Sequence, residues 1–168
     1  MFDSVVLGVD PGLGSVGFAV LARERGRPVL VWAADLSTPS GTATEQRLRR
    51  IHTVTAEILA ERRPEALAVE RLLWGRNTGS AMQVARASGV VMLAAAQAGI
   101  AVTEYAPLEV KMAVTGVGNA AKDQVRRGLG LILGREAVPS QPDAADAVAV
   151  AVCHLQQSRI RGLAGAAR

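Results

Sequence analysis

Two short apolar segments, each ending in a carboxylate, constrain the fold of this chain most strongly. Val5–Val9 is almost unbroken in its apolar character and is followed by Asp10, and Ala66–Val69 is followed by Glu70. Strands that are apolar on both faces are typical of a sheet covered by helices on both sides. Ligands of open α/β sheets bind beside the carboxyl ends of the strands. The sequence therefore predicts an α/β fold with two carboxylates at a binding edge.

The other elements follow from spacing. A glycine-containing turn at 24–27 between β-prone segments 18–23 and 28–33 predicts a hairpin. Thr42–Glu45 fits a capping box that would open a helix. The remaining expected elements are helices over 43–63, 79–98, 107–114, 121–133 and 142–157, and a strand over 100–105. The order predicts an antiparallel hairpin beside parallel strands in one domain over residues 1–157, followed by a basic tail, 158–168, that is expected to be flexible.

Composition excludes several classes of protein. The single cysteine, Cys153, cannot form an intrachain disulfide, and no Cys/His group has the spacing of a zinc site. The chain has no apolar run of about 18 residues and no signal-peptide pattern, so a cytoplasmic location is expected. The net charge is +4, and arginine supplies most of the basic side chains. This bias suits phosphate contacts, but a GC-rich coding sequence would explain it equally.

A second pair of carboxylates lies on the last expected helix. Asp143 and Asp146 are three residues apart and therefore share a face of a helix that is apolar nearly all round. Together with Asp10 and Glu70 they would repel one another unless a cation neutralised them. Carboxylate oxygens without Cys or His favour Mg²⁺ or Mn²⁺. Two such ions can clamp the attacking and leaving oxygens of a displacement at phosphorus.

Three of the four carboxylates also have an ordinary explanation. Asp10 precedes Pro-Gly and could be a turn residue. Asp143 could cap the last helix without binding a metal, and Ser140 is another possible cap. Glu70 could pair with a neighbouring arginine, Arg71 or Arg76. Their joint placement at two strand ends and on one apolar helix favours the metal site.

Two glycine-rich segments resemble nucleotide-binding loops without fitting them. Gly12–Gly17 matches G-x-G-x-x-G, but the residues that follow predict a hairpin rather than the helix that this fingerprint requires. Gly116–Lys122 lacks the ending of a Walker A loop. Asn119 is predicted to cap a helix whose first turn holds Lys122, where a cation is unfavourable unless it meets a phosphate. A solvated lysine is the alternative.

In combination, six segments resemble the RuvC family of Holliday-junction resolvases, over about residues 5–155. They are Val9–Gly12, Val69–Arg71, Asn77–Gly89, Val110–Lys111, Gly116–Lys122 and Pro142–Ala147. The resemblance implies an RNase H-like fold, with a five-stranded mixed sheet flanked by helices. It also implies a homodimer that resolves four-way DNA junctions in recombination and repair by paired symmetric nicks, using Mg²⁺ or Mn²⁺, and that works with a branch-migration helicase.

The resemblance also assigns residues. It implies metal binding by Asp10, Glu70, Asp143 and Asp146, and contact of Lys111 and Lys122 with the DNA backbone or the scissile phosphate. A water molecule whose pKa is lowered by the cations would attack phosphorus, and the 3′ oxygen would leave. Lys122 would act catalytically by neutralising charge in the transition state.

One position departs from the family pattern. Where the family often has a phenylalanine that stacks at the junction centre, this chain has Leu73, with Trp74 beside it. Either side chain could wedge between bases, or could simply anchor the loop to the core. Arg71 and Arg76 nearby would suit phosphate contact or could be solvated charges.

Small residues along 80–98 would allow a second copy of the chain to approach closely, but packing on the chain's own sheet would explain the same residues.

Other functions fit the sequence less well. An RNase H-like nuclease for other branched DNA or structured RNA is the closest alternative. An actin-like nucleotide-binding protein needs two domains, and this chain has length for one. A non-catalytic relative would typically have lost one of the four carboxylates.

Overall fold

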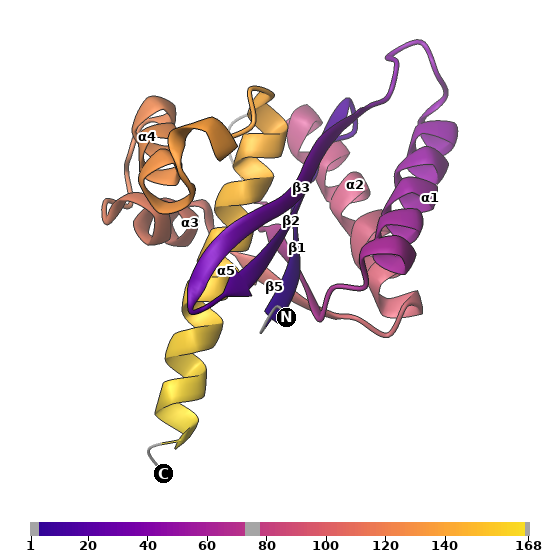
Figure 1. Cartoon of the computed structure of the whole chain (residues 1–168). Coiled ribbons are helices and arrows are strands. Elements are labelled where there is room, and N and C mark those ends of the chain that lie inside the picture. Colours follow the sequence, from indigo (N-terminus) through magenta and orange to yellow (C-terminus); the bar gives the residue numbers. More distant parts are fainter. Residues whose placement is uncertain (1–3, 73–77, 167–168) are drawn as a thin grey trace.

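The computed structural model describes residues 4–72 and 78–166, and it contains one five-stranded mixed sheet with helices on both faces (Figure 1). The strand order is β3-β2-β1-β4-β5, with antiparallel β3-β2-β1 and parallel β1-β4-β5 pairings. The strands are β1 (Ser4–Asp10), β2 (Ser15–Glu24), β3 (Arg27–Ser37), β4 (Ala66–Glu70) and β5 (Ala101–Tyr105). The helices are α1 (Thr44–Arg62), α2 (Thr78–Gln97), α3 (Pro107–Thr115), α4 (Lys122–Leu133), the 3₁₀ turn η1 (Arg135–Ala137) and α5 (Pro142–Ala166). The mixed α/β architecture is confirmed.

The sheet separates two apolar cores. Helices α1 and α2 cover one face, and α3, α4 and α5 cover the other (Figure 1). Successive side chains of β1 alternate between them: Val6 packs with α5, whereas Leu7 and Val9 pack with α1 and α2. This alternation follows from the two-residue period of a strand. It explains why the first strand has no polar face, as the apolar run predicted.

Helix α5 lies unusually close to the sheet because two glycines leave room for it. A Cβ atom on Gly8 would lie 2.3 Å from the carbonyl oxygen of Ala147, and one on Gly17 would lie 1.9 Å from the carbonyl oxygen of Asp143. No other residue type fits at such distances without moving the helix. The glycines therefore set the depth at which the first turn of α5 meets β1 and β2.

The hairpin and the last helix are both longer than the sequence predicted. The turn of the hairpin has positive φ at Arg25 (50°) and Gly26 (79°). This is the backbone of a two-residue turn whose twist matches that of the strands. The pairing of β2 with β3 therefore extends from Ser15 to Ser37. Helix α5 ends at Ala166 rather than near residue 157. Among the described residues, no helix combines the length and apolar character needed to cross a membrane.

Two predicted helix caps were wrong. Helix α1 has Ala43 at its N-cap with no side-chain hydrogen bond, so Thr42 lies one position too early to complete a capping box. Helix α4 has Ala121 rather than Asn119 at its N-cap, and the Ala121 N–H donates to the side chain of Gln124 at 2.8 Å. In both cases the helix starts later than the polar residue suggested, because backbone geometry decides the first turn.

Candidate active site

The parallel pairing of β1 with β4 brings two predicted site residues to the same end of the sheet. Val9 lies opposite Val69 in this ladder, so the next residues, Asp10 and Glu70, emerge side by side. Both strands end there. Strand register thus creates the first half of an acidic site from residues 60 positions apart.

The second half comes from the first turns of α5. Carboxylate oxygens of Asp10, Asp143 and Asp146 all lie within 4.8 Å of one another. Glu70 is not part of this closest group, but it is near enough for its charge to act on Asp10, and the charge of Asp146 acts on it. The structure therefore brings together the four carboxylates that the sequence predicted, with three of them closest to one another.

The electrostatics of this acidic cluster are unfavourable in the absence of a cation. Burial raises the pKa of Asp10 to about 7, and the charges of Glu70, Asp146 and Asp143 add to the effect, while Lys122 opposes it. Burial, followed by the charge of Asp146, also raises the pKa of Glu70. A divalent cation would relieve this repulsion, and a donor set of carboxylate oxygens suits a hard ion. The residues present therefore fit a metal site.

Both predicted lysines flank the acidic cluster. Lys122 is the first residue of α4, and its Nζ atom donates a hydrogen bond to Oδ2 of Asp146 at 3.2 Å although 85% of its side chain is exposed. The charge of Asp146 and this hydrogen bond raise the pKa of Lys122. Lys111, on α3, acts on Glu70 and opposes the rise in its pKa. Lys122 is therefore both exposed to solvent and paired with Asp146.

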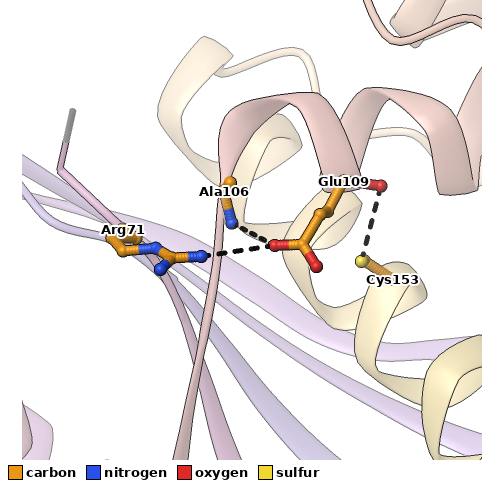
Figure 2. A network of polar contacts seen from close by, with 4 residues as sticks. All are labelled: Arg71, Ala106, Glu109 and Cys153. Atoms are coloured by element: carbon orange, nitrogen blue, oxygen red, sulfur yellow. Dashed lines mark hydrogen bonds and ion pairs between the residues drawn. The ribbon is translucent and has the colours of Figure 1, made fainter.

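Arg71 forms an ion pair with Glu109 of α3, at 3.5 Å (Figure 2). No ion pair joins Arg71 to its described neighbour Glu70. The same carboxylate accepts a hydrogen bond from the Ala106 N–H at 2.7 Å, and the Glu109 carbonyl accepts one from Sγ of Cys153 at 3.7 Å. This network ties the end of β4 to α3 and α5. It leaves the Arg71 side chain half exposed beside the acidic cluster.

Two residues near the site were not predicted from the sequence. Asp35 of β3 lies opposite Gly17, which lies opposite Asp10. Burial, followed by the charge of Asp143, raises the pKa of Asp35, and a hydrogen bond from the Ala144 backbone opposes this. The only sequence signal is an acid two residues beyond the β-prone segment 28–33, which has no meaning until the strand register is known.

The second missed residue is Arg47 of α1, which holds the loop that follows Asp10. Its guanidinium donates to the carbonyl of Leu13 at 3.1 Å and to the hydroxyl and carbonyl of Thr38 at 3.0 and 3.3 Å. The Thr38 hydroxyl also donates to the Leu13 carbonyl. These bonds join β3, α1 and the glycine loop. No pattern in the sequence indicates them, because they connect segments that are distant along the chain.

Three predicted DNA-binding residues, Leu73, Trp74 and Arg76, lie outside the described residues. The chain continues at α2, whose buried alanines pack in the core beneath the sheet. Packing on the chain's own sheet therefore accounts for part of the small-residue pattern along this helix.

Comparison with known proteins gives a consistent result. The family model described as "Crossover junction endodeoxyribonuclease RuvC" matches residues 6–154. Proteins of that name from Syntrophomonas wolfei and Rubrobacter xylanophilus are 41% and 40% identical to this chain, over 92% and 96% of its length and 90% of theirs.

Solved structures agree. Thermus thermophilus RuvC in complex with Holliday junction substrate is 36% identical, with a TM-score of 0.88 over 94% of this chain and 96% of that one. The yeast mitochondrial Holliday junction resolvase Ydc2, at 13% identity, has a TM-score of 0.64 over 89% of this chain and 78% of that one, which shows a shared fold. On the strength of the family match over nearly its whole length and of these relatives, the chain belongs to the RuvC family of crossover junction endodeoxyribonucleases.

Proposed function

We propose that this chain is a metal-dependent endonuclease that cuts four-way DNA junctions. The observation that carries the proposal is the acidic cluster, in which oxygens of Asp10, Asp143 and Asp146 lie within 4.8 Å of one another and Lys122 bonds to Asp146. The relative from Thermus thermophilus, solved with a Holliday junction substrate, supports this substrate.

The proposed mechanism assigns one role to each charged group. Asp10, Glu70, Asp143 and Asp146 would hold two Mg²⁺ or Mn²⁺ ions, which neutralise the carboxylates and supply the Lewis acidity for hydrolysis of a phosphodiester. The ammonium group of Lys122 would lie against the scissile phosphate and stabilise the charge that develops on it. Lys111 would bind the DNA backbone beside Glu70, and Arg71 would add a further phosphate contact.

We also propose that two copies act together. One face of α2 packs in the core, and its outer face presents Met82 and Leu93, which are 50% and 52% exposed. Small exposed residues between them, Ala85 and Gly89, would let a second helix approach closely. A two-fold dimer built on this face would place two active sites on one junction and produce paired, symmetric nicks.

The remaining parts of the proposal follow from the family. Residues 1–157 would form one nuclease domain, a branch-migration helicase would be a partner, and the enzyme would act in the cytoplasm in recombination and repair.

The test compares cleavage of a labelled four-way junction, a linear duplex and an RNA hairpin, with Mg²⁺, Mn²⁺ or EDTA. We expect the junction alone to be cut, and only with metal. Asp146→Asn should still bind the junction but not cut it, whereas Glu61→Gln, an exposed carboxylate of α1, should cut normally. Full cleavage in EDTA or by Asp146→Asn contradicts the mechanism. Equal cleavage of the duplex removes the selectivity, and preferred cleavage of the hairpin favours the RNA alternative.

A further inference from the structure

A basic hollow lies beside the acidic cluster, along α4. A first hollow of about 230 Å³ is lined by Lys122 of α4 and Asp146 of α5, among others, and so belongs to the site described above. A second, of about 640 Å³, shares Asp123 and Arg126 with the first and continues away from it. We call this second hollow the α4 groove. It is lined by Asp123, Arg126, Arg127, Gly130, Leu131, Arg135 and Val138.

The charge of the α4 groove is strongly one-sided. Three arginines line it against a single carboxylate, Asp123, which pairs with Arg127 at 3.0 Å. Both members of that pair are about 70% exposed, so water screens the interaction and a competing anion could take Arg127 at little cost. Within residues 4–72 and 78–166, neither Arg126 nor Arg135 takes part in an ion pair. The groove therefore offers guanidinium groups without bound anions.

The direction of the groove follows the axis of α4. Lys122 and Arg126 are one helical turn apart, and Gly130 lies one turn further along α4. These three positions form a row that extends roughly 12 Å from the acidic cluster. The stem of Arg135 packs against this far end, since a Cβ atom on Gly130 would lie 3.3 Å from Cγ of Arg135. The rise of DNA is about 3.4 Å per nucleotide along the helix axis, and successive phosphates of one strand lie farther apart than this rise, so roughly 12 Å spans about two or three nucleotides.

The apolar part of the lining also indicates the ligand. Leu131 is 85% exposed among these arginines, the most exposed large apolar side chain within the described residues. A small inorganic anion would make no use of it. A nucleic-acid backbone alternates phosphates with apolar sugar faces, and proteins contact both. The combination of arginines with an exposed leucine therefore suits a backbone rather than an isolated ion.

We infer that the α4 groove binds the phosphodiester backbone of the strand that is being cut, over the two or three nucleotides next to the scissile phosphate. This inference rests on the proposed function, because the scissile phosphate is placed by the acidic cluster. Arg126 and Arg135 would each contact a phosphate, and Lys122 would connect the groove to the reacting centre.

The test measures junction binding at a series of salt concentrations in the Asp146→Asn background. Each lost phosphate contact lowers the slope of log affinity against log salt by about one. The double variant Arg126→Gln/Arg135→Gln should therefore lose about two from the slope and bind roughly tenfold more weakly at moderate salt. The matched control, Arg49→Gln/Arg50→Gln on α1, changes the net charge equally on the opposite face of the sheet and should keep the slope.

A second measurement locates the contacts. Phosphates on each side of the cut are replaced one at a time by uncharged methylphosphonates. Replacement within the first three positions on one side should weaken binding to the chain with Arg126 and Arg135. It should have no effect once both arginines are changed to glutamine. The charge-conserving pair Arg126→Lys/Arg135→Lys should restore the slope.

An unchanged slope, an equal loss in the α1 control, or failure of the lysine pair to restore binding would overturn the inference. Cleavage by the unaltered chain is measured in parallel. If the unaltered chain cuts junctions but the double variant keeps the full salt slope, only the inference about the α4 groove is rejected. If it does not cut them, the proposed function itself fails.

Discussion

Nζ of Lys122 and Oδ2 of Asp146 lie 3.2 Å apart and connect the first turn of α4 to the first turns of α5. The bond places a permanent cation on a carboxylate that belongs to the acidic cluster. The charge of Asp146 raises the pKa of Lys122, so this lysine stays protonated throughout the neutral range. Its exposed position allows the ammonium group to turn from the carboxylate toward an incoming phosphate.

Replacement of Lys122 by methionine should therefore lower the rate of the chemical step. A charge that stabilises the transition state is typically worth 10²- to 10³-fold, and we expect a loss of about that size in single-turnover cleavage. Lys122→Arg should recover part of the rate. A loss confined to junction affinity, with the rate at saturating enzyme unchanged, would contradict the catalytic role.

Stability without metal should depend on pH in a defined direction. The pKa of Asp10 is raised from 3.8 to about 7 in the folded protein, so the unfolded chain releases this proton first. In EDTA the free energy of unfolding should fall by a few kcal/mol as the pH rises from about 4 to 7, and should change little from this group outside that window.

Asp10→Asn should reduce that fall, and Mg²⁺ should restore the stability of the unaltered chain at pH 8. Urea unfolding at several pH values measures both effects. Glu61→Gln is the control and should keep the full dependence. Stability that rises with pH across this window would contradict the raised pKa of Asp10 in the folded protein.

Gly17→Ala should damage the site through packing. The added methyl group would meet the carbonyl oxygen of Asp143 at 1.9 Å, so the start of α5 must move away from the sheet. Overpacking of this kind costs typically about 1–3 kcal/mol, and cleavage should fall further because Asp143 and Asp146 move together. Gly41→Ala, with no atom within 4 Å, is the matched control in thermal unfolding and cleavage assays.

Arg47→Met should loosen the loop that follows Asp10. The substitution keeps the aliphatic bulk but removes donors to Leu13 and Thr38. Leaving the buried carbonyl of Thr38 without this donor costs about 1–3 kcal/mol, whereas the carbonyl of Leu13 keeps its hydrogen bond from the Thr38 hydroxyl. We expect a loss of stability in that range and faster amide hydrogen exchange in the loop, compared with the exposed control Arg49→Met. Unchanged exchange would mean that β3 alone holds the loop.

Glu109→Gln should release Arg71 without disturbing α3. Glutamine can still accept the hydrogen bond from Ala106, and a half-exposed ion pair contributes at most about 1 kcal/mol. Junction affinity should therefore rise a few-fold while the free energy of unfolding hardly changes. The gain should vanish in an Arg71→Gln background, and a gain that persists there would assign it to overall charge instead.

Prediction from the sequence succeeded for features encoded in short patterns. The apolar runs before Asp10 and Glu70, and the apolar helix that carries Asp143 and Asp146, are local signals, and each placed its carboxylate correctly. The predicted caps at Thr42 and Asn119 failed because a one- or two-residue shift in helix start depends on packing elsewhere. The length of α5 was underestimated because its last residues have no apolar pattern.

The sequence by itself determined the fold class and the strands and helix that carry the four carboxylates. Burial and strand character follow from the order of apolar and polar side chains. Tertiary structure alone decided that Asp35 lies near the acidic cluster, that Arg47 holds the loop and that Arg71 binds Glu109. These relationships depend on strand register and on the depth at which α5 docks against Gly8 and Gly17. Such distances join residues far apart along the chain, and local propensity contains no information about them.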